Sequence, residues 1–295
     1  MIYTCTTNPS LDYYITIDEL IPGADLRSSS EIYDAGGKGV NVSIVLNNFR
    51  IPSVCLGFLG GFTKDYYLSY LSNYPNIQPL FTTIKDNTRI NLKIMDSYKE
   101  TDINAKGPSI SNEEFEKFTN RLVNIYEGDY FVLSGSIEED IQDKIVEVSK
   151  SLSNDKVKVV IDTHRDMLDR LIEVKPFMVK LNRSMLRDDD LFEFKSLLLE
   201  KGVSNVLYSS PNEPSYIFTE DSTYVCESLK DSLINVTGAS DSMVAGYLYG
   251  LIRGADSEES FKYANAASLA TCISNDLGSK EKIEELYDTI EVKKI

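Results

Sequence analysis

Residues 130–162, YFVLSGSIEEDIQDKIVEVSKSLSNDKVKVVID, contain two short apolar runs on either side of an amphipathic segment. The apolar runs at 130–133 and 157–162 are typical of buried strands, and residues 141–152 between them have the apolar spacing of a helix. Two buried strands joined by a helix form a βαβ unit, in which the strands run parallel. The stretch therefore predicts a parallel sheet covered by helices.

The same alternation continues along the chain. Further buried strands are predicted at 52–58, 177–181 and 203–208, and further helices at 39–49, 112–126 and 191–201. The last third is predicted to be helical over 240–252, 257–274 and 280–290. This pattern predicts an α/β fold with three layers, in which a mostly parallel central sheet has helices on both faces.

Three other segments, 12–18, 89–96 and 99–103, alternate apolar and polar residues with a period of two, which is typical of strands with one wet face. In RINLKIMD the apolar side carries Ile90, Leu92 and Ile94, and the polar side carries Arg89, Asn91 and Lys93. We interpret these segments as a small β-sheet lid with a cationic polar face. The lid is expected to be inserted by residues of about 12–34 and 87–104 into one domain that spans 1–295.

The composition disfavours several classes of function. The formal charge of −16 disfavours binding to nucleic acid and to anionic membranes. The four cysteines show no C-x-x-C spacing, so neither a disulfide framework nor a zinc site is indicated. The N-terminus lacks the pattern of a signal peptide and no apolar run reaches about 20 residues, so we expect a soluble, cytoplasmic protein.

Residues 236–247, VTGASDSMVAGY, place three small residues, Gly238, Ala239 and Ser240, immediately before Asp241 at the start of a helix. The unpaired N–H groups of a helix start suit a phosphate group. A carboxylate there would repel the phosphate unless the carboxylate faces the group that attacks the phosphate. Taken alone, the stretch is better explained by Asp241 or Ser240 as an ordinary helix cap.

A second glycine-containing stretch is AGGKGVNVS at residues 35–43. Gly37 permits close backbone approach, Lys38 adds a charge, and the following helix can carry Asn41 toward the same side. The stretch is not a P-loop, and G-x-G-x-x-G is absent from the chain, which disfavours a dinucleotide oxidoreductase. An ordinary turn remains an alternative for this stretch. For Arg89 the alternative is a solvated position on the surface of the lid.

Taken in order, these stretches resemble the ribokinase-like (PfkB) sugar kinases, and within them the bacterial 1-phosphofructokinases. The resemblance rests on five stretches that cover residues 6 to about 250: TTNPSLD, AGGKGVNVS, TRINLKI with ETDINAKGP, LSGSI and VTGASDSMVAGY. It implies a ribokinase-like α/β domain with a β-sheet lid. It also implies transfer of the ATP γ-phosphoryl group to the C6 hydroxyl of fructose 1-phosphate, with Mg²⁺ bridging the ATP phosphates and no direct protein ligands to the metal.

The resemblance also implies roles for individual residues. Asp241 is expected to be the general base, and the backbone N–H groups of Gly238, Ala239 and Ser240 are expected to form an anion hole. Two further sets of residues match binding positions of the family. The positions for the sugar phosphate are matched by Asp12, Gly37, Lys38, Asn41 and Arg89, and those for ATP by Lys180, Asn182 and Ser209. The apolar lid faces predict a homodimer through the two lid sheets.

The chain departs from the family pattern at four places. Ser240 replaces a glycine, Met185 stands where a glutamate helps to organise Mg²⁺, SSPNEPS at 209–215 replaces a glycine-containing nucleotide loop, and Ile137-Glu138 replaces Leu-Pro. Most departures fall on the ATP side. Two alternatives therefore stay open: a tagatose-6-phosphate kinase or another sugar kinase of the family, and a sugar-phosphate-binding regulatory protein with weakened catalysis.

Overall fold

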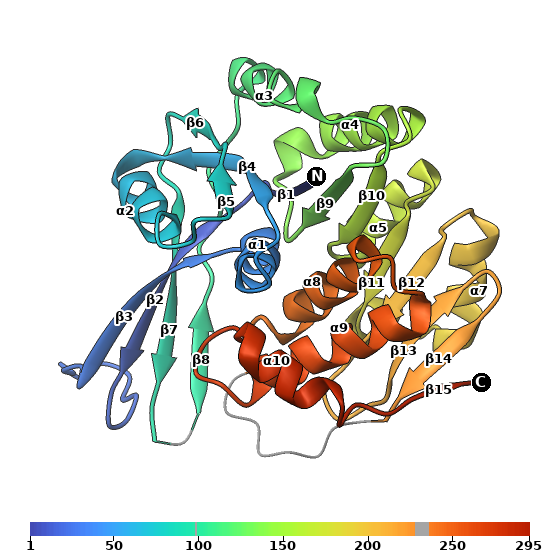
Figure 1. Ribbon diagram of the computed structural model, residues 1–295. Helices are drawn as coiled ribbons and strands as arrows, with labels where there is room; N and C mark the ends of the chain where they lie inside the picture. The colour runs from blue at the N-terminus through green and yellow to red at the C-terminus, as the bar shows by residue number, and fades with distance from the viewer. Residues whose placement is uncertain (98, 228–235) are drawn as a thin grey trace.

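The computed structural model describes residues 1–97, 99–227 and 236–295. A large sheet flanked by helices forms the body, and a smaller separate sheet projects from one side of it (Figure 1). The large sheet is mostly parallel. The predicted ribokinase-like α/β fold class is confirmed.

The main sheet has one parallel region and one antiparallel edge. From β5 through β12 all neighbouring strands are parallel, whereas β12, β13, β14 and β15 pair antiparallel. Strand β6 (Thr82–Ile84) pairs with β4 beyond the end of β5. The order across the sheet is β15 (Val292–Lys294), β14 (Thr223–Cys226), β13 (Ser215–Thr219), β12 (Asn205–Tyr208), β11 (Met178–Leu181), β10 (Lys158–Asp162), β9 (Tyr130–Ser134), β1 (Ile2–Thr6), β4 (Ser53–Gly60) and β5 (Ile77–Pro79).

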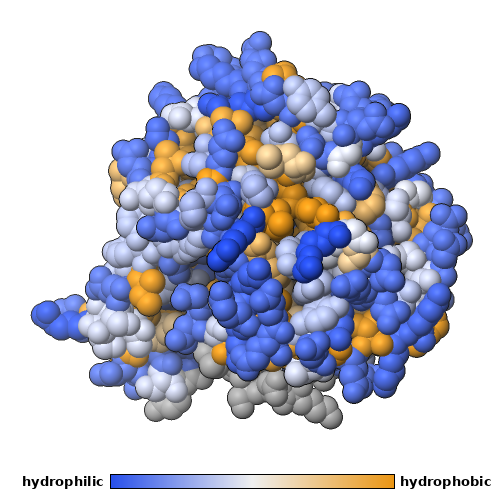
Figure 2. Space-filling model, viewed as in Figure 1, coloured by the Kyte–Doolittle hydropathy of each residue, from blue (hydrophilic) through white to orange (hydrophobic). Residues whose placement is uncertain are grey.

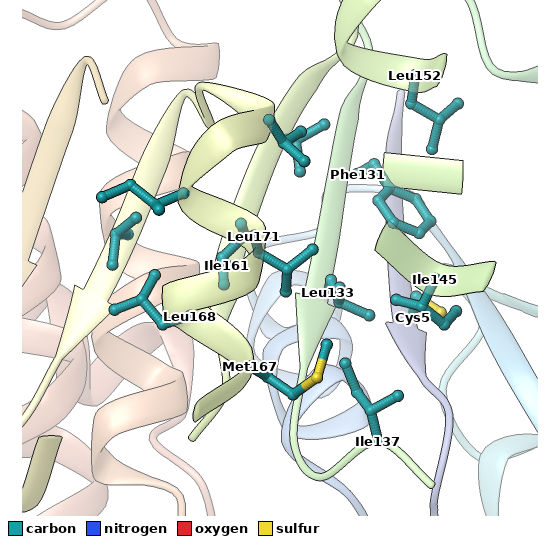
Figure 3. Packing of buried hydrophobic residues seen from close by; sticks show 14 of the residues in the cluster. Cys5, Phe131, Leu133, Ile137, Ile145, Leu152, Ile161, Met167, Leu168 and Leu171 are labelled. Carbon is teal, nitrogen blue, oxygen red and sulfur yellow. The ribbon is translucent and has the colours of Figure 1, made fainter. Parts of the chain in front are cut away.

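Helices cover both faces of this sheet because alternate strand residues point to opposite sides. One face packs against α3 (Asn112–Thr119), α4 (Gln142–Asn154), α5 (Arg165–Leu171) and α7 (Leu191–Glu200). The other packs against α1 (Lys38–Asn48), α2 (Gly61–Leu71), α8 (Ala239–Ile252), α9 (Ser257–Cys272) and α10 (Lys280–Tyr287). In β9, Phe131 and Leu133 join the first core, where Figure 3 shows them near Ile145 and Leu171. Val132 joins the second core.

The lid sheet has the strand order β3 (Ser30–Gly36), β2 (Ser10–Thr16), β7 (Arg89–Met95) and β8 (Glu100–Ile103). One row of apolar residues crosses all four strands through paired positions: Tyr33, Tyr13, Leu92 and Ile103. The adjacent row on the opposite face pairs Asp12 with Asn91, which is 5% exposed. The polar face of the lid is therefore partly covered by the body, and the apolar face is turned away from it.

The boundaries of several elements differ from the sequence predictions. The helix expected over 112–126 ends at Thr119 and is followed by a short 3₁₀ turn, Leu122–Asn124, because the chain must turn before β9. The patterns did not predict β1, α2 or the antiparallel edge β13 to β15. Strand β1 is buried along its whole length although three of its five residues are polar or cysteine, so no apolar run marked it.

The surface agrees with the acidic, polar composition. Figure 2 shows hydrophilic residues over most of the face in view, with scattered apolar patches. No helix within the described residues is long and apolar enough to cross a bilayer.

Candidate functional site at the carboxyl ends of the strands

Asp241 lies in the first turn of α8 and is 4% exposed. The helix begins after Gly238, which has a left-handed φ of 76° and lies so close to Leu277 that a Cβ would come within 2.5 Å of its Cδ2. Glycine is therefore favoured there by the backbone conformation, whereas the Leu277 side chain could move to make room for a Cβ. The Oδ2 atom of Asp241 accepts a hydrogen bond of 2.8 Å from Nδ2 of Asn41, so α1 and α8 meet at this carboxylate.

Three further charged groups surround Asp241. Lys38, at the start of α1, forms an ion pair with Asp162 at the end of β10, with 2.8 Å between Nζ and Oδ1. Asp162 is 2% exposed and Lys180, from β11, is 1% exposed. The ammonium group of Lys180 donates to the carbonyl of Leu181 at 2.8 Å. Two carboxylates and two ammonium groups thus meet where the parallel strands end.

In this group, burial and the neighbouring opposite charges shift the pKa values in opposite directions. Burial raises the pKa of Asp241 to about 6, although Lys38 counters it, because a carboxylate loses its hydration inside the protein. Burial also lowers the pKa of Lys180 to about 8, against the raising effect of Asp162. For Lys38 burial acts to lower the pKa, but Asp162 and Asp241 outweigh it and the pKa is raised. Asp241 consequently has the pKa of a group that can exchange a proton near neutral pH.

Ala239 and Ser240 line a neighbouring pocket of about 240 Å³. Asn182 and Ser209 line it too, as does the loop that continues through Glu213. The N–H group of Ala239 donates to the carbonyl of Val236 at 3.4 Å. Two of the three expected anion-hole residues and two of the three expected ATP-side residues thus border one cavity.

Lys180 lies outside this cavity. Its side chain is buried beneath the strand ends and faces the carboxylates of Asp162 and Asp241. The expected ATP-side residue Lys180 is thus placed near these carboxylates and does not line the pocket.

Two of the departures from the family pattern acquire a structural explanation. Ser240 has no positive φ, and the residue with the left-handed backbone is Gly238, so a serine side chain causes no backbone strain at position 240. Met185 is 5% exposed and packs into the apolar core, while its carbonyl accepts from Arg165 at 2.9 Å.

The sugar-side residues divide between helix α1 and the lid. Gly37 precedes α1 with a φ of 141°, and a Cβ there would lie 2.9 Å from Thr6 Cγ2. In the lid, Oδ1 of Asp12 accepts from Asn91 at 2.8 Å and from Ser10 at 2.7 Å. These contacts orient the Asp12 carboxylate on the polar face of the lid.

Arg89 lies at the base of the lid. Its terminal nitrogens donate to the carbonyls of Ala105 at 3.2 Å and Asn8 at 3.1 Å. Burial lowers its pKa, against the raising effects of Asp12 and Glu138. Arg89 is thus a half-buried cation between the lid and the ends of the strands.

The side chains of this site offer few ligands for Mg²⁺. In the described parts of the chain no three carboxylate, histidine or cysteine side chains form a metal cluster. Oδ2 of Asp162 is buried and has no partner among the described residues. Because Mg²⁺ is usually bound by one or two carboxylates together with water and substrate phosphates, this single free oxygen fits a hydrated ion that accompanies ATP.

Sequence reasoning missed several polar residues of this region. Asp162 was assigned only to a strand, although its place as the last residue of a buried parallel strand is where ligands bind in open α/β sheets. Asn91 was noted only as part of a polar face. Asn8 and Ser136 follow β1 and β9, and they meet Glu138, which the sequence marked only as a departure from the family pattern, in the folded chain.

Comparison with known proteins identifies the family. Residues 8–282 match the pfkB family carbohydrate kinases. A 1-phosphofructokinase from Bacillus subtilis (strain 168) is 33% identical over 305 residues, covering 100% of both chains. A D-tagatose-1-phosphate kinase from Bacillus licheniformis is 28% identical over 303 residues, covering 99% of each.

A solved structure agrees with the fold. The crystal structure of phosphofructokinase-2 from Escherichia coli in complex with fructose-6-phosphate has a TM-score of 0.89 at 21% identity, covering 98% of each chain. That identity shows the shared fold alone, and the family rests on the matches of sequence. The chain belongs to the pfkB family of ATP-dependent carbohydrate kinases.

Proposed function

We propose that this kinase transfers the γ-phosphoryl group of ATP to the C6 hydroxyl of fructose 1-phosphate, giving fructose 1,6-bisphosphate and ADP. The observation that carries the proposal is the buried carboxylate of Asp241 at the start of α8, which contacts Asn41 and lies beside the pocket lined by Ser240. The relative from Bacillus subtilis, a 1-phosphofructokinase, supports this substrate.

In the proposed mechanism Asp241 is the general base. Asn41 occupies Oδ2, which leaves Oδ1 for the substrate hydroxyl. The C6 hydroxyl transfers its proton to Asp241 as its oxygen attacks the γ-phosphorus, and the bond between that phosphorus and the departing ADP oxygen breaks. The N–H groups of Gly238, Ala239 and Ser240 would stabilise the charge on the transferring group together with the helix dipole, and the N–H of Ala239 would have to give up its long contact with the carbonyl of Val236 to do so. A positioned base typically contributes about 10²- to 10⁴-fold to the rate.

The remaining residues position the two substrates. On the sugar side, Asp12, Gly37, Lys38 and Asn41 would bind hydroxyl groups, and Arg89 would bind the 1-phosphate. On the donor side, Asn182 and Ser209 would contact ATP in the shared pocket. Lys180 would act from beneath the site by moderating the charge of Asp162 and Asp241.

We propose that Oδ2 of Asp162, which has no partner among the described residues, would hold the hydrated Mg²⁺ through one of the water molecules of the ion, in keeping with the expected lack of a direct protein ligand. When bound, the ion neutralises charge on the ATP phosphates. Met185 cannot take part because a thioether is a poor ligand for a hard cation. We place this activity in the cytoplasm, where ATP and sugar phosphates are available, and assign it to the whole chain as one domain with its lid.

A tagatose-phosphate kinase is the second candidate. It is favoured by the nearly full-length match to a D-tagatose-1-phosphate kinase. Tagatose differs from fructose only in the configuration at C4, so the same base and anion hole would serve both sugars.

The substrate assignment is tested by ADP release with Mg-ATP against fructose 1-phosphate, fructose 6-phosphate, tagatose 1-phosphate, tagatose 6-phosphate and ribose. We expect the highest kcat/KM with fructose 1-phosphate, because its phosphate and C6 hydroxyl match the two ends of the site. A higher value with either tagatose phosphate would favour the second candidate. Binding of sugar phosphate without ADP release would instead identify a regulatory protein.

Replacement of the base gives a second prediction. Asp241→Asn should lower kcat by roughly 10²-fold or more, because an amide cannot accept the hydroxyl proton. Sugar-phosphate affinity measured by calorimetry should persist, since the amide keeps the size of the carboxylate. Turnover close to that of the wild type would rule out Asp241 as the base.

The raised pKa of Asp241 predicts the pH profile. The base must be ionised, so kcat/KM should fall as pH drops through about 6, the pKa to which burial raises this carboxylate in the ligand-free protein. Sugar phosphates also titrate near pH 6, so the control is calorimetric affinity over the same range. A profile that stays flat to pH 5 after this correction would contradict the assignment.

We also propose that two copies dimerise through the apolar faces of their lids. Ile103 is 54% exposed, Tyr33 is 40% exposed and Ile90 is 39% exposed, all on the face turned away from Asp12. Packing against a second lid would remove this apolar surface from water.

Light scattering tests the dimer. The wild type should have twice the chain mass at micromolar concentration, and Ile103→Glu should give a monomer because it places a charge in the interface. Ile32→Glu is the matched control, since Ile32 is 56% exposed on the opposite lid face. A monomeric wild type would refute the proposed interface.

A further inference from the structure

Four polar side chains meet at the ends of β1 and β9 and at the base of the lid: Asn8, Arg89, Ser136 and Glu138. We call them the Glu138 cluster. Nδ2 of Asn8 donates to Oγ of Ser136 at 3.2 Å and to Oε1 of Glu138. Arg89 joins the cluster by donating to the carbonyl of Asn8 at 3.1 Å.

The backbone that returns from the lid lies directly on this cluster. A Cβ at Gly107 would come within 2.1 Å of Oε1 of Glu138 and 2.4 Å of Oδ1 of Asn8. Glu138 is therefore half-buried between the ends of the strands and the returning lid segment, and its carboxylate is held beside Asn8.

Two atoms of the cluster are buried without a partner among the described residues: Oδ1 of Asn8 and Nε of Arg89. Buried polar atoms nearly always have partners in native proteins, so these two indicate a ligand that brings a donor and an acceptor together. Asn8 is itself 5% exposed. A hydroxyl group beside an anionic oxygen, as in a sugar phosphate, would satisfy both atoms.

Glu138 places a negative charge close to these two atoms. Burial raises the pKa of Glu138, and Arg89 opposes that effect most strongly. Asp140 and Glu139 also raise its pKa and Lys106 lowers it, while Asp12 faces Arg89 from the lid. An anion bound at Arg89 would thus lie in the field of a carboxylate that already compensates the guanidinium.

We propose that Glu138 determines how tightly the site binds phosphate, by acting as the counter-charge of Arg89 in the free protein and repelling the phosphate of the sugar phosphate. The inference rests on the proposed use of Arg89 for the substrate phosphate. It assigns a role to the residue that replaces proline in the family pattern. The product carries a second phosphate, so a moderated affinity also favours its release.

The test compares Glu138→Gln and Glu138→Ala with Glu139→Gln, in which an exposed neighbouring carboxylate is removed instead. Calorimetry measures the Kd of each protein for fructose 1-phosphate and for unphosphorylated fructose. Both Glu138 variants should bind fructose 1-phosphate roughly 3- to 10-fold more tightly, because a repulsion between like charges is lost. Their affinity for fructose, and both affinities of Glu139→Gln, should match the wild type.

Unchanged or weaker binding of fructose 1-phosphate would overturn the proposal, as would a change of equal size for fructose, which would indicate a structural effect. If Glu138→Gln does not fold, the alanine variant decides. No binding of fructose 1-phosphate to any of the proteins would also overturn it. Tighter binding without ADP release would leave the role of Glu138 intact and refute only the proposed kinase substrate.

Discussion

The site depends on a group of four charges, of which three are almost fully buried and that of Lys38 is half-buried. Asp162 and Asp241 are almost fully buried, and the ammonium groups of Lys38 and Lys180 offset their charge. Buried charges are tolerated only when they are paired and hydrogen-bonded, so removing any one of the four would leave an uncompensated charge. The same balance leaves Asp241 with a pKa suited to accepting a proton. Stability and chemistry therefore rest on one electrostatic arrangement.

The parallel sheet makes this arrangement possible. Asp162 ends β10 and Lys180 lies in β11, so neighbouring strands deliver both groups to one edge. Helices α1 and α8 pack against each other and begin at that same edge, which brings Asn41 and Asp241 together although they are 200 residues apart. Gly37 and Gly238 allow these helix starts because both have a positive φ, which residues with a side chain rarely adopt.

The lid serves the site through its polar face. Asp12 is fixed by Ser10 and Asn91, and Arg89 connects the lid to the loop after β1. Side chains alternate along a strand, so the residues between these polar ones point to the other face. Apolar residues gather there, and Tyr13 stacks on Tyr33 with 4.3 Å between ring centroids. One sheet thus presents a polar surface to the body and an apolar surface outward.

Periodicity and ordered motifs in the sequence were enough to predict the α/β class, the helices α1, α4, α7 and α8, and the family. Those features depend on neighbouring residues, which the sequence displays directly. Tertiary structure alone decided that Lys180 faces the carboxylates, that position 240 needs no glycine, and that Asn8, Arg89 and Glu138 meet. The sequence patterns also did not predict strand β1, because this strand is fully buried although three of its five residues are polar or cysteine. These outcomes depend on contacts between distant segments, whose geometry no local pattern encodes.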